Sequence, residues 1–168
     1  SNAVQNSIYS SVISGNNNNI FSSEKSSILG GINNFINVSN YSNIIGGNNH
    51  VITSATGSFI GAGQNHEINS SILSFIGGGR SNTITGSTYT NILGGSNNNI
   101  DSSNRSSIVG GTANRISSAA VTSFIGGGKL NTITTSGYSN IIGGNDNSIT
   151  VFSIYNYICI CSKPIHFS

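Results

Sequence analysis

The chain carries few side chains that could do chemistry, and two histidines are the most suggestive of them. His50 and His66 lie sixteen residues apart, and imidazole is a common ligand of metal ions. The positions sixteen residues before and after this pair hold Asn34 and Asn82 rather than a carboxylate or a cysteine that would complete a metal shell. The motif Cys159-x-Cys161 lacks the paired spacing of a zinc site. We therefore expect the histidines to replace asparagine in a repeated turn.

Catalytic groups and cofactor motifs are equally sparse. Glu24, Glu67, Asp101 and Asp146 stand alone, without the partner that a catalytic carboxylate pair requires. The string at 77–79 resembles a phosphate loop, but neither a Lys-Ser/Thr pair nor a helical pattern follows it. A calcium-binding roll needs aspartate at a fixed place in every repeat, where this chain has asparagine. The sequence therefore predicts no enzyme, no cofactor and no metal site.

These residues belong to a sixteen-residue repeat that occupies most of the chain. Nine repeats follow one another, one of them a residue longer, and each has two β-branched residues spaced eight apart. The first of each pair is Val12, Ile28, Ile44, Ile60, Ile76, Ile92, Ile108, Ile125 or Ile141, and the second is Ile20, Ile36, Ile52, Ile68, Ile84, Ile100, Ile116, Ile133 or Ile149.

Two further columns of the repeat indicate where the chain reverses. Glycine always stands three residues after the first isoleucine, and asparagine or histidine three residues later. Glycine takes positive φ without strain and asparagine tolerates the left-handed region, so we predict a corner there with a ladder of stacked amides. The glycines are Gly15, Gly31, Gly47, Gly63, Gly79, Gly95, Gly111, Gly128 and Gly144, and the second column is Asn18, Asn34, His50, His66, Asn82, Asn98, Asn114, Asn131 and Asn147.

A second corner closes each repeat with serine or threonine, and the extra residue of the long repeat falls within 118–121 of this corner. Two corners per repeat leave room for two short strands, so we predict a parallel β-roll, or solenoid, of nine turns. Glycine, asparagine and serine disfavour helix, and the isoleucines are too regular for a disordered chain. Successive turns would pair about 4.8 Å apart, with the two isoleucine columns facing each other across a thin core.

The residues flanking the first isoleucine form a coupled pattern. In six turns the following residue is aliphatic, whereas in three turns the preceding residue is phenylalanine and the following one is Gly61, Gly77 or Gly126. Every turn thus places one large apolar group on the outer face of this strand. Because the second isoleucine has polar neighbours, we expect the apolar stripe to be covered by other copies of the chain. The predicted interface is Ile13, Leu29, Ile45, Phe59, Phe75, Leu93, Val109, Phe124 and Ile142.

Two other columns are candidates for ligand contact. Tyrosines recur at one position of the second corner, where exposed rings could stack on sugars or protein, or could simply pack the corner. Strands Thr83-Ile84-Thr85 and Thr132-Ile133-Thr134 are typical of ice-binding faces, although Glu67, Asp101 and Arg115 interrupt that face. The tyrosines are Tyr9, Tyr41, Tyr89 and Tyr138, of which the last three are the candidate ligand contacts.

The motifs Ser-Asn-Ile-Ile-Gly-Gly-Asn (42–48 and 139–145) and Ser-Phe-Ile-Gly-Gly-Gly (74–79 and 123–128) resemble the head repeats of trimeric autotransporter adhesins, and related repeats of bacteriophage and viral fibres. The resemblance covers about residues 4–150. It implies a left-handed parallel β-roll, three of which pack around a threefold axis with the apolar stripe as the trimer interface. The repeat is longer than is usual in that family, so a bacterial and a viral source both stay open.

The chain divides into three parts: residues 1–3, which resemble an expression scar, the repeat domain 4–150, and a cap or tail at 151–168 where the pattern ends. The basic residues are scattered, which predicts no nucleic-acid partner, and no apolar run is long enough to span a membrane. We expect a non-enzymatic fibrous protein at a cell surface, outer membrane or virion, assembled as a homotrimer and attaching to a host surface protein or glycan. A structural spacer and an ice-binding solenoid are the alternatives.

Overall fold

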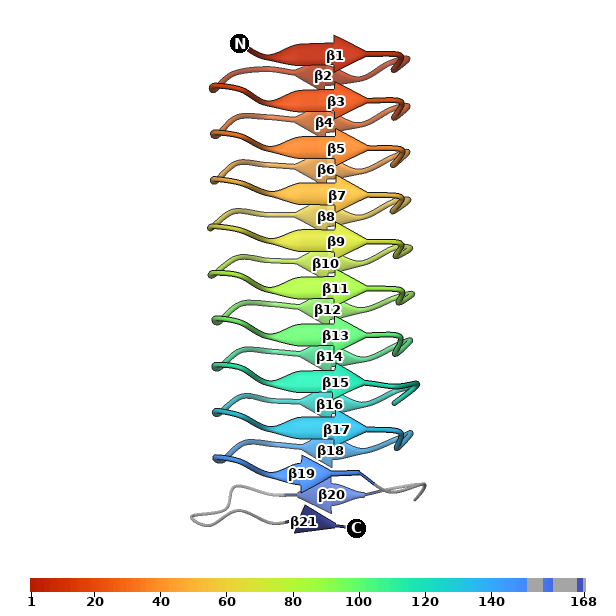
Figure 1. The fold of residues 1–168 in the computed structure, drawn as a ribbon, viewed down its shortest axis with the longest axis vertical. Coiled ribbons are helices and arrows are strands. Elements are labelled where there is room, and N and C mark those ends of the chain that lie inside the picture. Colours follow the sequence, from red (N-terminus) through yellow and green to blue (C-terminus); the bar gives the residue numbers. More distant parts are fainter. Residues whose placement is uncertain (151–155, 159–165, 168) are drawn as a thin grey trace.

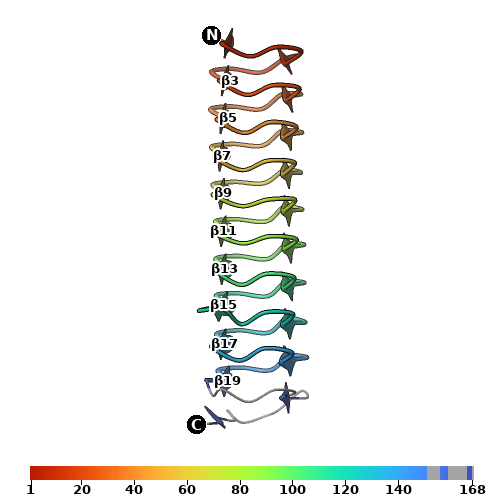
Figure 2. The same ribbon diagram turned by 90° about the vertical axis from the view of Figure 1, so that its right-hand side faces the viewer.

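The computed structural model describes residues 1–150, 156–158 and 166–167, which form a straight rod of stacked turns (Figure 1). None of these residues is helical, as the composition predicted. Accordingly, the described part of the chain has no helix that could cross a membrane. The rod has two parallel sheets, which Figure 2 shows as two columns joined by short connections.

Each turn contributes one strand to each sheet, and both sheets follow the order of the sequence. The eleven-stranded sheet contains β1 (Ala3–Gln5), β3 (Asn19–Phe21), β5 (Phe35–Asn37), β7 (Val51–Thr53), β9 (Glu67–Asn69), β11 (Thr83–Thr85), β13 (Asn99–Asp101), β15 (Arg115–Ser117), β17 (Thr132–Thr134), β19 (Ser148–Ile149) and β21 (His166–Phe167). The ten-stranded sheet contains β2 (Ser11–Val12), β4 (Ser27–Ile28), β6 (Asn43–Ile44), β8 (Phe59–Ile60), β10 (Phe75–Ile76), β12 (Asn91–Ile92), β14 (Ser107–Ile108), β16 (Phe124–Ile125), β18 (Asn140–Ile141) and β20 (Tyr157–Ile158).

The register of the sheets confirms the predicted period. Ile76 of β10 pairs with Ile92 of β12, and Ile84 of β11 pairs with Ile100 of β13, so each strand meets its equivalent in the next turn. Every isoleucine of the two columns is completely buried, and Val12 packs against them with partial exposure. Fully burying such a side chain stabilises a fold by about 1.5 to 3 kcal/mol. The core is therefore a thin double row of isoleucines between the sheets.

Two kinds of corner join the strands. The glycine corner leads from the ten-stranded to the eleven-stranded sheet and forms the left edge in Figure 1, and the serine corner returns the chain at the right edge. Residue 118 or 119 supplies the extra residue of the long repeat, since Ser118 and Ala119 both have positive φ before Ala120 regains the usual buried position. The prediction that this insertion lies in the second corner is confirmed. Of the predicted cap or tail, β20 and β21 continue the two sheets, and residues 151–155, 159–165 and 168 lie outside the described residues.

Candidate functional site

The predicted interface residues lie together on the outer face of the ten-stranded sheet, and we call them the apolar stripe. Each turn contributes one of them, in parallel register with the next. The stripe is continuous, although its residue precedes the buried isoleucine in the phenylalanine turns and follows it in the other turns. Ile13, Leu29, Ile45, Leu93 and Val109 are between 37% and 70% exposed, and Phe59, Phe75, Phe124 and Ile142 are half-buried.

The phenylalanine turns show why the two flanking positions are coupled. The Cε1 atom of Phe75 lies 3.3 Å from the place where a Cβ on Gly77 would be, and Phe124 stands in the same relation to Gly126 at 3.4 Å. Each ring therefore covers the space that the aliphatic side chain fills in other turns. A Cβ on Gly77 would also collide with the carbonyl oxygen of Leu93. Phe59 and Phe75 stack with ring centroids 5.4 Å apart. Side chains of the stripe therefore also pack against each other between successive turns.

The outer face of the eleven-stranded sheet is mainly polar, as the sequence predicted. Arg115 and Asp101 form an exposed ion pair at 3.9 Å, a type that contributes little to stability. The threonine strands β11 and β17 are separated by β13 and β15, which carry these charges, so the face has no continuous rank of threonine. Sequence reasoning missed a smaller apolar group on the first turns, Phe21, Phe35 and Val51, all half-buried. Their position beside the second isoleucine was the signal that could have identified them.

The predicted amide ladder is present in the glycine corner and is completely buried. Asn98 is typical: its Oδ1 accepts the backbone N–H of Asn114 at 3.0 Å, and its Nδ2 donates to the carbonyls of Gly94 and Gly111 at 3.0 and 3.1 Å. The sequence predicted left-handed backbone at the ladder residue itself. The structure places it one residue earlier, because Asn97 has φ 56° and Asn98 does not lie in that region. The ladder residue is needed for its side chain, and the residue before it makes the bend.

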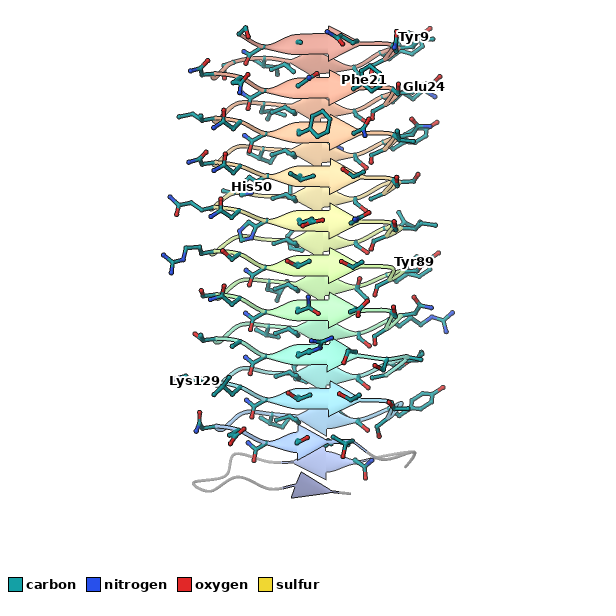
Figure 3. The ribbon with its side chains drawn as sticks, viewed as in Figure 1. Tyr9, Phe21, Glu24, His50, Tyr89 and Lys129 are labelled. Carbon is teal, nitrogen blue, oxygen red and sulfur yellow. The ribbon has the colours of Figure 1, made fainter. Side chains whose placement is uncertain are left out.

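His50 and His66 occupy this ladder as a stacked pair, with ring centroids 4.9 Å apart and planes 3° from parallel. Nδ1 of each ring accepts the backbone N–H of the next turn, from His66 at 3.2 Å and from Asn82 at 3.1 Å. Each Nε2 is buried with no hydrogen-bond partner among the described residues. Figure 3 shows His50 at the glycine corner on the left edge of the rod.

This arrangement favours neutral histidines. Burial lowers the pKa of His50 to about 4, with repulsion from His66 as a smaller cause, and the nearby Gly63 carbonyl offsets part of the shift without completing a hydrogen bond to Nε2. Burial likewise lowers the pKa of His66. No cluster of three metal-ligating side chains occurs in residues 1–150, 156–158 and 166–167.

The serine corner contains two buried hydroxyl columns, of which sequence reasoning found only one. The expected column closes the turn, and its Ser42 Oγ accepts the N–H of Ser58 at 3.1 Å. In the second column Ser23 Oγ accepts the N–H of Ser39 at 2.9 Å, and alanine replaces serine at Ala55 and Ala120. The first column is Ser26, Ser42, Ser58, Ser74, Thr90, Ser106, Ser123 and Ser139, and the second is Ser23, Ser39, Ala55, Ser71, Ser87, Ser103, Ala120 and Ser136.

The tyrosines of the serine corner lie on its outer edge rather than inside it. Tyr9 is 85% exposed, and Tyr41, Tyr89 and Tyr138 are about half exposed, at 54%, 55% and 49%. Figure 3 shows Tyr9 and Tyr89 projecting from the right edge of the rod. Lys25, one turn from Tyr41, donates from Nζ to the Tyr41 hydroxyl at 3.0 Å, and Nζ lies 4.9 Å from the ring centroid.

The two candidate surfaces, the apolar stripe and the tyrosines of the serine corner, each extend along the rod. The described residues form no pocket that could enclose a small substrate. Neither the protein-family models nor the curated proteins contain a match to this chain. Its function must accordingly be argued from the surfaces of the solenoid.

Proposed function

We propose that this chain is a non-enzymatic structural protein, a rigid β-solenoid that assembles as a homotrimer and serves as the head or stalk of an adhesive fibre on a cell surface or virion. The observation that carries the proposal is the apolar stripe. It occupies one outer face of the rod for nine turns, while the opposite face is mainly polar apart from Phe21, Phe35 and Val51.

The length of the stripe supports burial by other copies of the same chain. With turns about 4.8 Å apart, nine turns extend over roughly 43 Å, and a continuous apolar strip of that length is unusual on a soluble monomer. A second rod in the same direction presents an equally long stripe with the same spacing. Self-association therefore covers the stripe over its full length without requiring another partner.

The number three and the adhesive role come from the resemblance of the repeats to trimeric autotransporter adhesins and to phage or viral fibres. A closed ring of three rods gives each stripe neighbours on both sides of the axis. The eleven-stranded sheets and the corners would then face outward, where they can meet a host surface. A spacer without binding activity shares this architecture and differs only in what the exposed edges do.

The proposal is tested by the solution mass of residues 1–168, measured by light scattering. We expect three times the chain mass of 17.3 kDa. Changing Phe59, Phe75 and Phe124 to serine should lower that mass, whereas the matched control F21S/F35S on the eleven-stranded sheet should retain it. A folded wild-type monomer would overturn the proposal, and so would equal loss of assembly in both variants.

A further inference from the structure

One column on the outer edge of the serine corner combines exposed aromatic rings with cations. It has one residue per turn, in the order Tyr9, Lys25, Tyr41, Gly57, Leu73, Tyr89, Arg105, Thr122 and Tyr138. We call it the tyrosine column. A cation follows a tyrosine in the next turn twice, as Tyr9 with Lys25 and as Tyr89 with Arg105.

The backbone shows that these side chains are not required by the corner. Every residue of the column has positive φ, between 52° and 66°. Left-handed backbone disfavours residues other than glycine, and Gly57 shows that the corner accepts glycine. Burial of the tyrosine rings offsets little of this unfavourable backbone energy, because the rings are about half exposed or more. The same left-handed backbone occurs in two other columns, for example at Asn17 and Ser22, so the tyrosine column is distinguished by its exposed side chains and not by its backbone.

Lys25 shows how the column presents charge. Its hydrogen bond to Tyr41 raises the pKa of the ammonium group, with the nearby Glu24 carboxylate as a minor cause, and the group remains exposed at the edge. The serine corner carries Lys25 and Arg105 against Glu24 among its described residues. The column therefore places a cation one turn after a tyrosine at two points along the rod, Lys25 and Arg105.

We propose that the tyrosine column binds a linear anionic polysaccharide lengthwise, with its sugar rings stacked on tyrosine and its carboxylate or sulfate groups on Lys25 and Arg105. The inference rests on the proposed adhesive function and names its ligand class. The rings and cations of the column follow the rod axis, with Ile8, Val38 and Ile72 exposed beside them, and a line of this kind suits an extended polymer that lies lengthwise. Single-stranded nucleic acid requires a basic groove along its backbone, and two cations in nine turns do not supply one.

The test measures binding of the full chain to four immobilised probes: heparin, hyaluronan, neutral dextran and a thymidine oligonucleotide. Heparin and hyaluronan separate sulfate from carboxylate recognition. Binding to either above dextran and the oligonucleotide supports the proposal. Binding to neither, or equal binding to the oligonucleotide, overturns it.

Matched variants locate the site. Y9S/Y41S/Y89S should weaken binding by roughly tenfold or more, and K25Q/R105Q should weaken it more than R80Q/K129Q, which removes the same charge from the glycine corner. Equal losses in the two charge variants would indicate nonspecific attraction and overturn the assignment. The solution mass of Y9S/Y41S/Y89S should be unchanged; a lower mass would place the tyrosines between chains instead. A trimer that binds no polysaccharide contradicts this inference alone, whereas a monomer contradicts the proposed assembly.

Discussion

Both corners of the solenoid reverse the chain between the two sheets, but they differ in the residues that they accept. In the glycine corner the glycines have φ between 85° and 107°, and a Cβ on Gly95 would collide with the next turn. In the serine corner the left-handed residues have φ near 55°, and tyrosine, lysine, arginine, leucine and threonine all occupy one column there. The glycine corner also has a left-handed column that varies, from Asn97 to Leu130. The backbone therefore prescribes the glycine position of the first corner and leaves the left-handed columns of both corners free to vary.

The largest expected effect is a methyl group added to the glycine corner. Gly95→Ala places a Cβ against the backbone of Gly111 and the amide of Asn98, so we expect a loss of about 4 kcal/mol or more of unfolding free energy. Gly86→Ala, in the serine corner, meets only Ser102 Oγ at 3.5 Å and should cost about 1 kcal/mol. Urea unfolding at matched chain concentration measures both. Equal losses would remove the distinction between the corners.

The ladders should differ in the same direction. Asn98→Ala leaves the N–H of Asn114 and the carbonyls of Gly94 and Gly111 without their side-chain partner, a loss of about 3 kcal/mol. Ser103→Ala removes one accepted and one donated bond, to Ala120 and Asp101, in a column where alanine occurs naturally, and should cost about 1 kcal/mol. Thermal unfolding of the two variants compares them directly. A larger loss for Ser103→Ala would contradict this ranking.

Acid should weaken the glycine corner through its histidines. Because burial lowers the pKa of His50 from 6.5 to about 4, the unfolded chain binds a proton more tightly than the folded chain between these values. The unfolding free energy is unaffected by His50 protonation above about pH 6.5. It falls by on the order of 2 to 3 kcal/mol as the pH approaches 4. In H50N/H66N, which restores the asparagine column, this pH-dependent loss should disappear from urea unfolding curves. An unchanged pH profile in that variant would show that other groups cause it.

The smallest effect concerns the tyrosine column. Tyr89→Gly relieves a left-handed tyrosine but makes the unfolded chain more flexible, and these contributions are of similar size. We therefore expect the unfolding free energy to change by less than about 0.5 kcal/mol. Calorimetry of this variant tests whether the ring packs the corner. A loss above about 2 kcal/mol would make Tyr89 a structural residue.

Much of this architecture could be predicted from sequence because every turn of the solenoid uses the same residue pattern. The isoleucine columns identified both sheets and the core, and the exchange of Ile45-type for Phe59-type residues located the outer face. The second hydroxyl column was missed because serine is so common here that Ser23 and Ser39 carry no distinguishing pattern. The left-handed residue was misplaced because asparagine often occupies both adjacent positions, as at Asn97 and Asn98, and only three-dimensional structure separates a bend from a ladder.

The positions of the candidate surfaces could be predicted from the sequence, but their assembly could not. The sequence placed one apolar group per turn on one face, and the structure adds that Phe75 fills the space above Gly77. Exposure of the tyrosines did not follow from the repeat, because a corner residue can pack inward or project outward. Ligands and chain number depend on partners that one repeat does not encode.

The most direct test of the central claim is cross-linking through the apolar stripe. In a background with Cys159 and Cys161 changed to serine, Val109→Cys on the stripe is compared with Thr85→Cys on the opposite face, under mild oxidation. If stripes from several chains meet around one axis, Val109→Cys should form covalent dimers efficiently and Thr85→Cys should not. Equal cross-linking at the two positions, or cross-linking only through Thr85→Cys, would contradict the claim that the stripe joins copies of this chain.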